Sequence, residues 1–251
     1  MGGGPIMKQK MYVLGVAALV VALLALSGVA QSAMWVGGEL GGNFNAYPSM
    51  SVSGAGLNSS SQTEIRPSVI GGATIGYDFV NAGFGAYAWP SWMQYFSFAM
   101  DITFNRLAIQ DAGPGIGKFF PANTRLNGRE IAWTFLFMAH YGFMKDSEVP
   151  TGRINPYIGV GPAIVWTGVD GTFPAVVPKG NATYSSNYGD SAMNVALVVE
   201  PGIRWVCLKN VSIDTAMRWR YSVPSYNIND LSIKVNPLNQ FAVLVRANYH
   251  F

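Results

Sequence analysis

The sequence of 251 residues contains a single cysteine, Cys207, and only two histidines. One cysteine excludes an internal disulfide bond, and a free thiol of low reactivity is its ordinary state. No cluster of His and Cys residues has the spacing of a metal site, so we expect neither a metal nor a cofactor. Hydrolysis of the Ser-His-Asp type needs a histidine oriented between a nucleophile and a carboxylate. Neither His140 nor His250 lies in a recognisable catalytic motif, which favours a protein that is not an enzyme.

Charged residues are also scarce. They make up 12% of the chain, whereas about a quarter of an ordinary soluble domain is charged. The formal net charge of +3 is too small to indicate a nucleic-acid partner. Beyond residue 33, the sequence has no apolar run long enough for a transmembrane helix and no stripe with the 3.6-residue period of an amphipathic helix.

The first 33 residues have the pattern of a secretory signal peptide. Two lysines precede an apolar run at residues 11–30, and the triplet Ala30-Gln31-Ser32 at its end fits an A-x-small cleavage site. These features together are typical of a cleavable export signal. An uncleaved anchor is the alternative, because the run is long enough to span a bilayer. We therefore expect a signal peptide at 1–33 and a single exported domain at 34–251.

Alternation of apolar and polar residues with period two dominates the rest of the chain. This period predicts β-strands whose two faces meet different surroundings. Eight such segments are recognisable, at residues 35–45, 69–79, 95–105, 130–143, 156–168, 193–205, 211–221 and 241–251. Their lengths suit tilted transmembrane strands, and an even number suits a closed antiparallel barrel. The predicted fold is an all-β, eight-stranded, up-and-down transmembrane barrel.

The connections between these segments alternate in length. The long ones, rich in Gly, Ser, Asn and Pro, are 46–64, 109–128, 170–190 and 222–238, and the short ones are 145–153 and 208–210. Outer-membrane barrels have long loops outside and short periplasmic turns. Residues 80–93 break the rule, and we interpret this segment as interfacial, with Trp89 and Trp92 at headgroup depth.

A water-soluble antiparallel barrel or sandwich is the structural alternative, with the apolar faces packed in a core. Two features favour the membrane. Small residues and glycines crowd the polar side, as a narrow filled interior requires. Large aromatic residues lie at strand ends on the apolar side, like the girdles of a membrane barrel: Phe44, Phe79, Phe96, Trp133, Tyr141, Trp166, Trp205, Trp219, Tyr249 and Phe251.

Charged residues of the strands fall on the polar side. Arg or Lys facing lipid near the midplane would cost roughly 2–4 kcal/mol each, and only Arg106, near a strand end where it can reach the headgroups, lies on the lipid side. An eight-stranded interior is just wide enough for side chains to fill it. Because unpaired buried charge is costly, we predict a salt-bridged plug, with a narrow ion path along the same residues as the alternative. The predicted network consists of Glu39, Asp78, Asp101, Glu130, His140, Glu200, Arg204, Asp214, Arg218, Arg220 and Arg246.

Four stretches resemble the bacterial outer-membrane β-barrel family of small OmpA/OmpX-like barrels: WVGGELGGNFN, PYIGVGPAIV, EPGIRW and the terminal ANYHF. The resemblance covers roughly residues 34–251. It implies an integral protein of the outer membrane of a Gram-negative bacterium, in contact with outer-membrane lipids and lipopolysaccharide. In this family the aromatic end of the last strand resembles the signal read by the assembly machinery, which gives Ala247, Tyr249 and Phe251 that expected role.

We expect a structural or surface-interaction function, because binding usually resides in loops on a rigid scaffold. The sequence does not name a loop ligand. Aromatic residues of the loops that are candidates for contacting one are Phe173, Tyr184, Tyr188 and Tyr226. A narrow porin-like channel for small solutes or ions is the first alternative, and a lipid-modifying enzyme is the second.

Overall fold

The computed structural model describes residues 34–54, 57–62, 64–79, 89–110, 125–175, 184–228 and 231–251. The expected signal peptide at 1–33 lies outside the described residues, as does most of the 80–93 connection. Among the described residues, none of the helices has the length and apolar character needed to cross a membrane.

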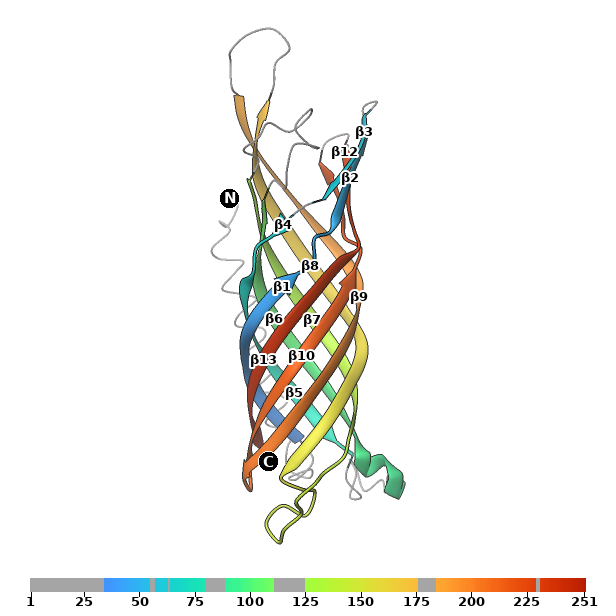
Figure 1. The fold of residues 1–251 in the computed structure, drawn as a ribbon, viewed down its shortest axis with the longest axis vertical. Helices are drawn as coiled ribbons and strands as arrows, with labels where there is room; N and C mark the ends of the chain where they lie inside the picture. The colour runs from blue at the N-terminus through green and yellow to red at the C-terminus, as the bar shows by residue number, and fades with distance from the viewer. Residues whose placement is uncertain are drawn as a thin grey trace, which may run out of the picture.

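Eight long antiparallel strands close into a barrel (Figure 1). They are β1 (Met34–Asn45), β5 (Ser68–Asp78), β6 (Phe96–Gln110), β7 (Arg125–His140), β8 (Ile154–Ala175), β9 (Tyr184–Leu208), β10 (Val211–Ser222) and β13 (Leu238–His250). The order around the ring is β6-β5-β1-β13-β10-β9-β8-β7, and pairing of β6 with β7 closes it. The predicted eight-stranded, up-and-down barrel is confirmed.

A second sheet of four strands lies at the end of the barrel remote from the C-terminus (Figure 1). It contains β2 (Ser49–Gly54), β3 (Leu57–Gln62), β11 (Ser225–Ile228) and β12 (Leu231–Asn236), and the short β4 (Glu64–Ile65) pairs separately with β6. The expectation of loops throughout 46–64 and 222–238 was therefore wrong. β8 and β9 likewise pair as far as Ala175 and Tyr184, well into the expected loop. These strands have only four to six residues, so any alternation in them is too short to stand out from the Gly, Ser and Asn around it.

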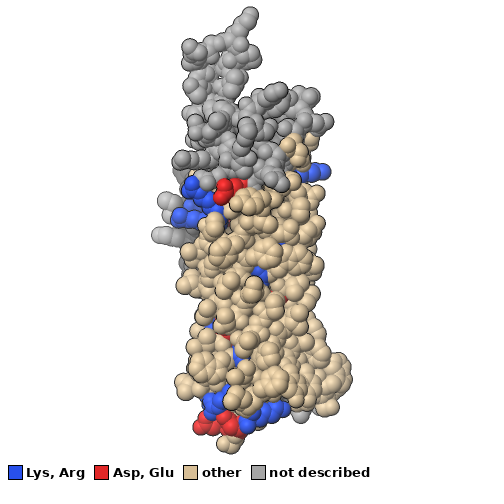
Figure 2. Space-filling model, in the orientation of Figure 1, with Lys and Arg blue, Asp and Glu red and all other residues tan. Residues whose placement is uncertain are grey.

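Side chains alternate between the two faces of the barrel with charge inside and apolar groups outside. On β10, Asp214, Arg218 and Arg220 are buried. Their outward neighbours Met217 and Tyr221 are 62% and 39% exposed. Figure 2 shows the consequence on one face of the molecule, where a broad band is almost uncharged and charged groups gather near its two ends. A water-soluble barrel would have the opposite arrangement, which excludes that alternative.

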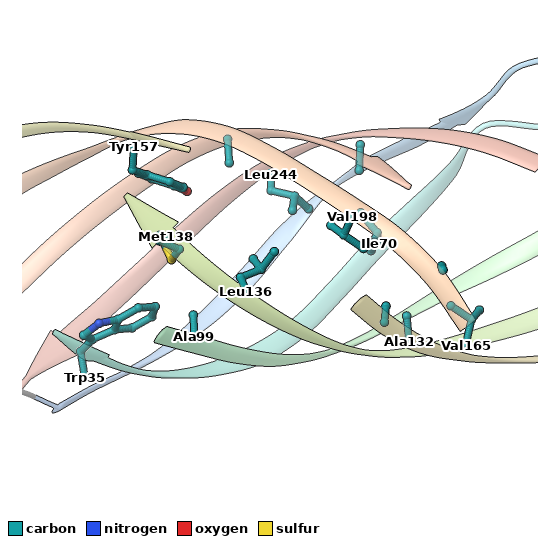
Figure 3. Close-up of a cluster of buried hydrophobic side chains, with 14 residues drawn as sticks. Trp35, Ile70, Ala99, Ala132, Leu136, Met138, Tyr157, Val165, Val198 and Leu244 are labelled. Atoms are coloured by element: carbon teal, nitrogen blue, oxygen red, sulfur yellow. The ribbon is translucent and has the colours of Figure 1, made fainter. Parts of the chain in front are cut away.

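Inward glycines make room for aromatic side chains near the C-terminal end. A Cβ added at Gly76 would lie 2.1 Å from the ring of Trp35, its cross-strand partner. A Cβ added at Gly202 would lie 2.5 Å from the ring of Tyr157, again its partner. Buried apolar side chains continue along the interior (Figure 3), among them Met138, Leu136, Leu244, Val198, Ile70 and Val165. These buried side chains occupy the lumen from Trp35 near the periplasmic end to Val165.

The short connections lie at the end that holds the C-terminus, which is the periplasmic end by the rule that long loops face outward. Lys209 and Asn210 form the turn between β9 and β10. A 3-10 helix, η2 (Ser91–Tyr95), precedes β6, and Trp92 in it is 58% exposed. In the turn between β7 and β8, a hydrogen bond from the backbone amide of Val149 and one from Arg153 lower the pKa of Asp146.

Candidate functional site: the ionic network inside the barrel

The residues predicted to line the interior come from seven of the eight barrel strands, and the structure places all of them on the inward face. Most are buried, whereas Asp78 and His140 are half-buried near the periplasmic mouth. Strand parity explains this, because a regular strand sends every second side chain to the same face.

Arg218 lies at the centre of the network. Its guanidinium donates two hydrogen bonds to Asp101, at 2.7 and 3.2 Å. It also donates to Glu200 at 2.6 Å, and lies 3.6 Å from a carboxylate oxygen of Glu39. β10, which carries Arg218, is four places from β6, which carries Asp101, in a ring of eight strands. The pair therefore joins opposite walls and crosses the lumen.

Arg246 forms a second node beside this one. It donates to Glu39 at 2.7 and 3.0 Å and to Glu200 at 3.1 Å. The hydroxyl of Tyr157 donates to Glu200 at 3.2 Å and accepts from Arg246 at 3.5 Å. Bidentate and charge-assisted hydrogen bonds are the strong ones. Glu39 and Glu200 thus each bridge two arginines, which makes the two nodes one network.

Arg220 and Glu130 pair separately, 2.5 Å apart. The amide of Gln240 donates to both carboxylate oxygens of Glu130, at 3.1 and 3.2 Å, and Arg220 also reaches the hydroxyl of Thr103 at 3.4 Å. Sequence reasoning missed Gln240 because it considered only charged residues. Its position on the inward register of the last strand was the available signal.

A third group lies at the periplasmic mouth. Arg204 is 3.3 Å from Asp214 and 3.5 Å from Asp78. Its guanidinium lies 4.6 Å from the ring centroid of Trp35, a cation–π contact. Asp78 also accepts hydrogen bonds from Ser97 at 2.7 Å and from the Trp35 indole at 3.2 Å. Trp35 was not predicted as a member of this group, although its inward register was visible in the sequence.

His140 lies at the mouth without joining the network. Its Nε2 atom is buried and has no hydrogen-bond partner among the residues that the structure describes. His250, which was not predicted to belong to the network, contacts the hydroxyl of Ser212 through Nε2 at 3.0 Å. A cavity of about 980 Å³ opens at this end, with His140, His250 and Arg204 in its lining.

The same region holds a contact between a serine and a histidine. Ser212 and His250 are in contact, but Asp214 lies 3.5 Å from the serine hydroxyl, and no carboxylate hydrogen-bonds to the histidine ring in the described part of the chain. Ser212 is also fully buried. No group of three or more His, Cys, Asp or Glu residues within the described ranges is placed to hold a metal ion.

The other predicted residues lie elsewhere. Ala247 and Tyr249 face outward on β13, and the rings of Tyr249 and Phe251 meet edge to face at 5.4 Å. Tyr226, expected as a surface aromatic of a loop, is instead 4% exposed in β11 and donates a hydrogen bond to Thr167 at 2.7 Å. Tyr226 pairs with Ile233 of β12, and its side chain lies on the buried face of β11. This strand was not predicted from the sequence. The side chains of Phe173, Tyr184 and Tyr188 lie outside the described residues.

Solved structures similar to this one are small outer-membrane barrels. OprG from Pseudomonas aeruginosa matches with a TM-score of 0.53 and 10% identity, over 89% of this chain and 99% of that one. AlkL matches with a TM-score of 0.43 and 14% identity, over 90% and 93%, and Neisserial surface protein A with 0.38 and 13%, over 87% and 97%. No family model matches the sequence, and a search of curated proteins gave no match.

The similarity to OprG shows the fold. The outer surface of the barrel shows that the fold lies in a membrane. Closed barrels satisfy every backbone hydrogen bond between strands, which is why they can span a bilayer. Here such a barrel carries an apolar outer band with exposed aromatic residues at its periplasmic edge, among them Tyr141, Trp205 and Tyr249. The chain is an integral membrane barrel of the kind that spans the bacterial outer membrane.

Proposed function

We propose that the protein is a sealed barrel of the outer membrane, without catalytic activity, whose role is structural or in surface interaction. The contact between Arg218 and Asp101 carries the proposal, because it joins opposite walls of the ring. A permeating solute would have to separate this pair while both groups are buried. Removing one partner of a buried ion pair is strongly destabilising, by about 3–5 kcal/mol. We therefore expect the closed state to predominate at rest.

Conductance across planar bilayers tests this proposal. The purified protein should give no steady single-channel steps, and liposomes that contain it should swell no faster than empty liposomes. Steady single-channel steps from the wild-type protein would contradict the sealed barrel and indicate a channel.

A narrow cation path is the second candidate. Six carboxylates of the interior face four arginines, namely Glu39, Asp78, Asp101, Glu130, Glu200 and Asp214 against Arg204, Arg218, Arg220 and Arg246. Because there are two more carboxylates than arginines, the interior of the barrel carries a formal excess of negative charge. Any current would then be selective for cations, and the ratio of permeabilities in a salt gradient would show it.

The extracellular end offers the surface for interaction. The sheet of β2, β3, β11 and β12 extends the barrel beyond the membrane and presents Lys234 as an exposed charge. The Tyr226–Thr167 hydrogen bond connects this sheet to the barrel interior. A rigid platform of this kind is where a surface ligand or partner would bind. Deleting the β2–β3 hairpin should leave the barrel folded and remove surface binding.

Residues Ala247, Tyr249 and Phe251 are the proposed assembly signal. They lie at the periplasmic end of the last strand, on its lipid face. The edge of this strand stays accessible until β1 pairs with it and closes the barrel. Phe251→Ala should lower the amount of folded protein in the outer membrane without changing the stability of the molecules that fold. Equal membrane levels for Phe251→Ala and wild type would exclude this role.

A lipid-modifying activity is tested by the variant Ser212→Ala. The serine–histidine contact is the one feature of the described chain that resembles a catalytic pair. An unchanged lipid A composition in cells that express the variant or the wild type, compared with cells that lack the protein, agrees with a barrel that is not an enzyme. A modification that disappears with Ser212→Ala would show the contrary.

A further inference from the structure

Two arginines face each other on the outside of the barrel near its extracellular end. Arg106 on β6 and Arg129 on β7 are direct cross-strand partners, and both are exposed. Both are outward by parity, because their neighbours Asn105 and Glu130 are buried in the interior. Like charges directly opposite each other on adjacent strands are destabilising. A negative charge placed between the two guanidinium groups would relieve this repulsion.

The protein does not supply this charge from its described residues. Neither Arg106 nor Arg129 forms an ion pair or a side-chain hydrogen bond within the described ranges. Arg66 adds a third exposed guanidinium to the same rim, since its backbone amide bonds to the carbonyl of Ala108 at 3.0 Å. Glu64, exposed nearby on β4, makes no ion pair with any of the three. Arg153 at the periplasmic end differs, because it pairs with two carboxylates.

The next row of outward residues toward the membrane centre is entirely apolar. Phe104, Ile131 and Trp166 are cross-strand partners on β6, β7 and β8, and their side chains are 53%, 39% and 39% exposed. Two residues along a strand span about 7 Å, and the tilt of the strands shortens this distance along the membrane normal. The two arginines therefore lie immediately above the apolar band, at the depth of the headgroup phosphates. Figure 2 shows basic side chains at this upper edge of the uncharged band.

There is also space beside the arginines. Gly168 on β8 is the cross-strand partner of Arg129. A Cβ added at Gly168 would have no atom within 4 Å, so the outer surface is open there. A headgroup can approach Arg129 from this side without displacing a protein side chain.

We propose that Arg106 and Arg129, with Arg66 beside them, bind the phosphate of a glycolipid in the outer leaflet while its acyl chains lie on Phe104, Ile131 and Trp166. Arginine pairs with phosphate through two parallel hydrogen bonds, and two facing guanidinium groups can share one phosphate. The proposal rests on the outer-membrane location proposed above and does not depend on whether the lumen is sealed. It assigns the unpaired cations of this rim to the lipid rather than to a soluble ligand.

The test uses the full exported chain in a neutral detergent, with diphosphorylated lipid A as the probe. Arg106→Gln combined with Arg129→Gln removes both charges and keeps much of the side-chain length. Lys234→Gln, which removes an exposed cation from β12, is the matched control. Native mass spectrometry counts bound lipid, and melting temperatures with and without lipid give a second measurement. A shift in gel mobility on heating shows that each variant is folded.

We expect the double variant to bind diphosphorylated lipid A about tenfold or more weakly, because it loses charge-assisted hydrogen bonds, and Lys234→Gln to bind like the wild type. Lipid A stripped of its phosphates should bind the wild type as weakly as the double variant binds the intact lipid. Without lipid, the double variant should be at least as stable as the wild type, since a repulsion has been removed.

Three results would overturn the proposal. Equal binding of the double variant and the wild type would exclude the arginines. Competition by inorganic phosphate at the same concentration as lipid A would indicate a site for a free anion. A loss of stability of the double variant in lipid-free detergent would mean that the arginines serve the protein's own fold. Channel conductance changes none of these outcomes, so a failure here is separable from a failure of the sealed barrel.

Discussion

Replacing Arg218 by methionine is the most direct perturbation of the interior. The variant keeps a side chain of similar length but leaves Asp101, Glu200 and Glu39 facing each other without the shared cation. Asp101 has no other arginine within ion-pair distance in the described chain. Removing one partner of a buried pair costs about 3–5 kcal/mol. We expect the free energy of unfolding to fall by about this amount.

The assay is unfolding by urea in phospholipid vesicles, followed by tryptophan fluorescence and by the gel mobility of the unheated protein. Met217→Leu is the control on the same strand, since Met217 faces outward and is 62% exposed. A conservative apolar change there should cost about 1 kcal/mol or less. The comparison separates the effect of the network from a general sensitivity of β10.

Adding Asp101→Asn to Arg218→Met should recover part of the lost stability, because it removes one of the carboxylates that Arg218 compensated. The single variant should also admit a cation-selective leak, since the carboxylates that remain line the lumen. If Arg218→Met lost less than about 1 kcal/mol and Asp101→Asn recovered nothing, the network would not hold the barrel closed, and the physical basis of the plug would be wrong.

Two further predictions concern the glycines and the periplasmic turn. Gly202→Ala should lower the free energy of unfolding by about 1–3 kcal/mol because its Cβ would overlap the ring of Tyr157, whereas Gly38→Ala, which meets nothing within 4 Å, should be nearly neutral in the same urea titration. The hydrogen bonds from Val149 and Arg153 lower the pKa of Asp146 in the folded state. The stability that Asp146 gives to this turn is therefore fully present above its unfolded pKa of 3.8. This stability is lost as the pH falls through the lower pKa of the folded state. Amide exchange at Val149 should therefore accelerate only at that acidic pH, and Asp146→Asn should remove the pH dependence; an unchanged profile in this variant would contradict the assignment.

The barrel strands were predictable because membrane and lumen impose opposite chemistry on the two faces of each strand. On β10 the outward residues Ile213, Met217 and Tyr221 alternate with the inward residues Asp214, Arg218 and Arg220. This alternation alone determines which face of the sheet each side chain occupies. The second sheet was not predictable in this way. In β3 serine stands at three consecutive positions, 59–61, so period two carries no information there, and β2 is only six residues long.

The specific partners inside the barrel were less predictable than the set of inward residues. Parity gives the face of a residue, but contacts across the lumen depend on the stagger between strands that are far apart in sequence. Arg218 meets Asp101 at a separation of 117 residues, and no local pattern relates the two. His140 shares the inward face, and its Nε2 atom has no hydrogen-bond partner among the residues that the structure describes.

The arginines of this protein differ in what neutralises them, according to where they lie in the barrel. In the interior, where water is scarce, Arg218 and Arg246 share carboxylates supplied by other strands. At the periplasmic rim, Arg153 is neutralised by acids of its own turn. At the extracellular rim, Arg106 and Arg129 face each other with no acid supplied by the described chain. An anion from the surrounding medium would relieve the repulsion between these two arginines, and phosphate is the anion that a membrane surface offers.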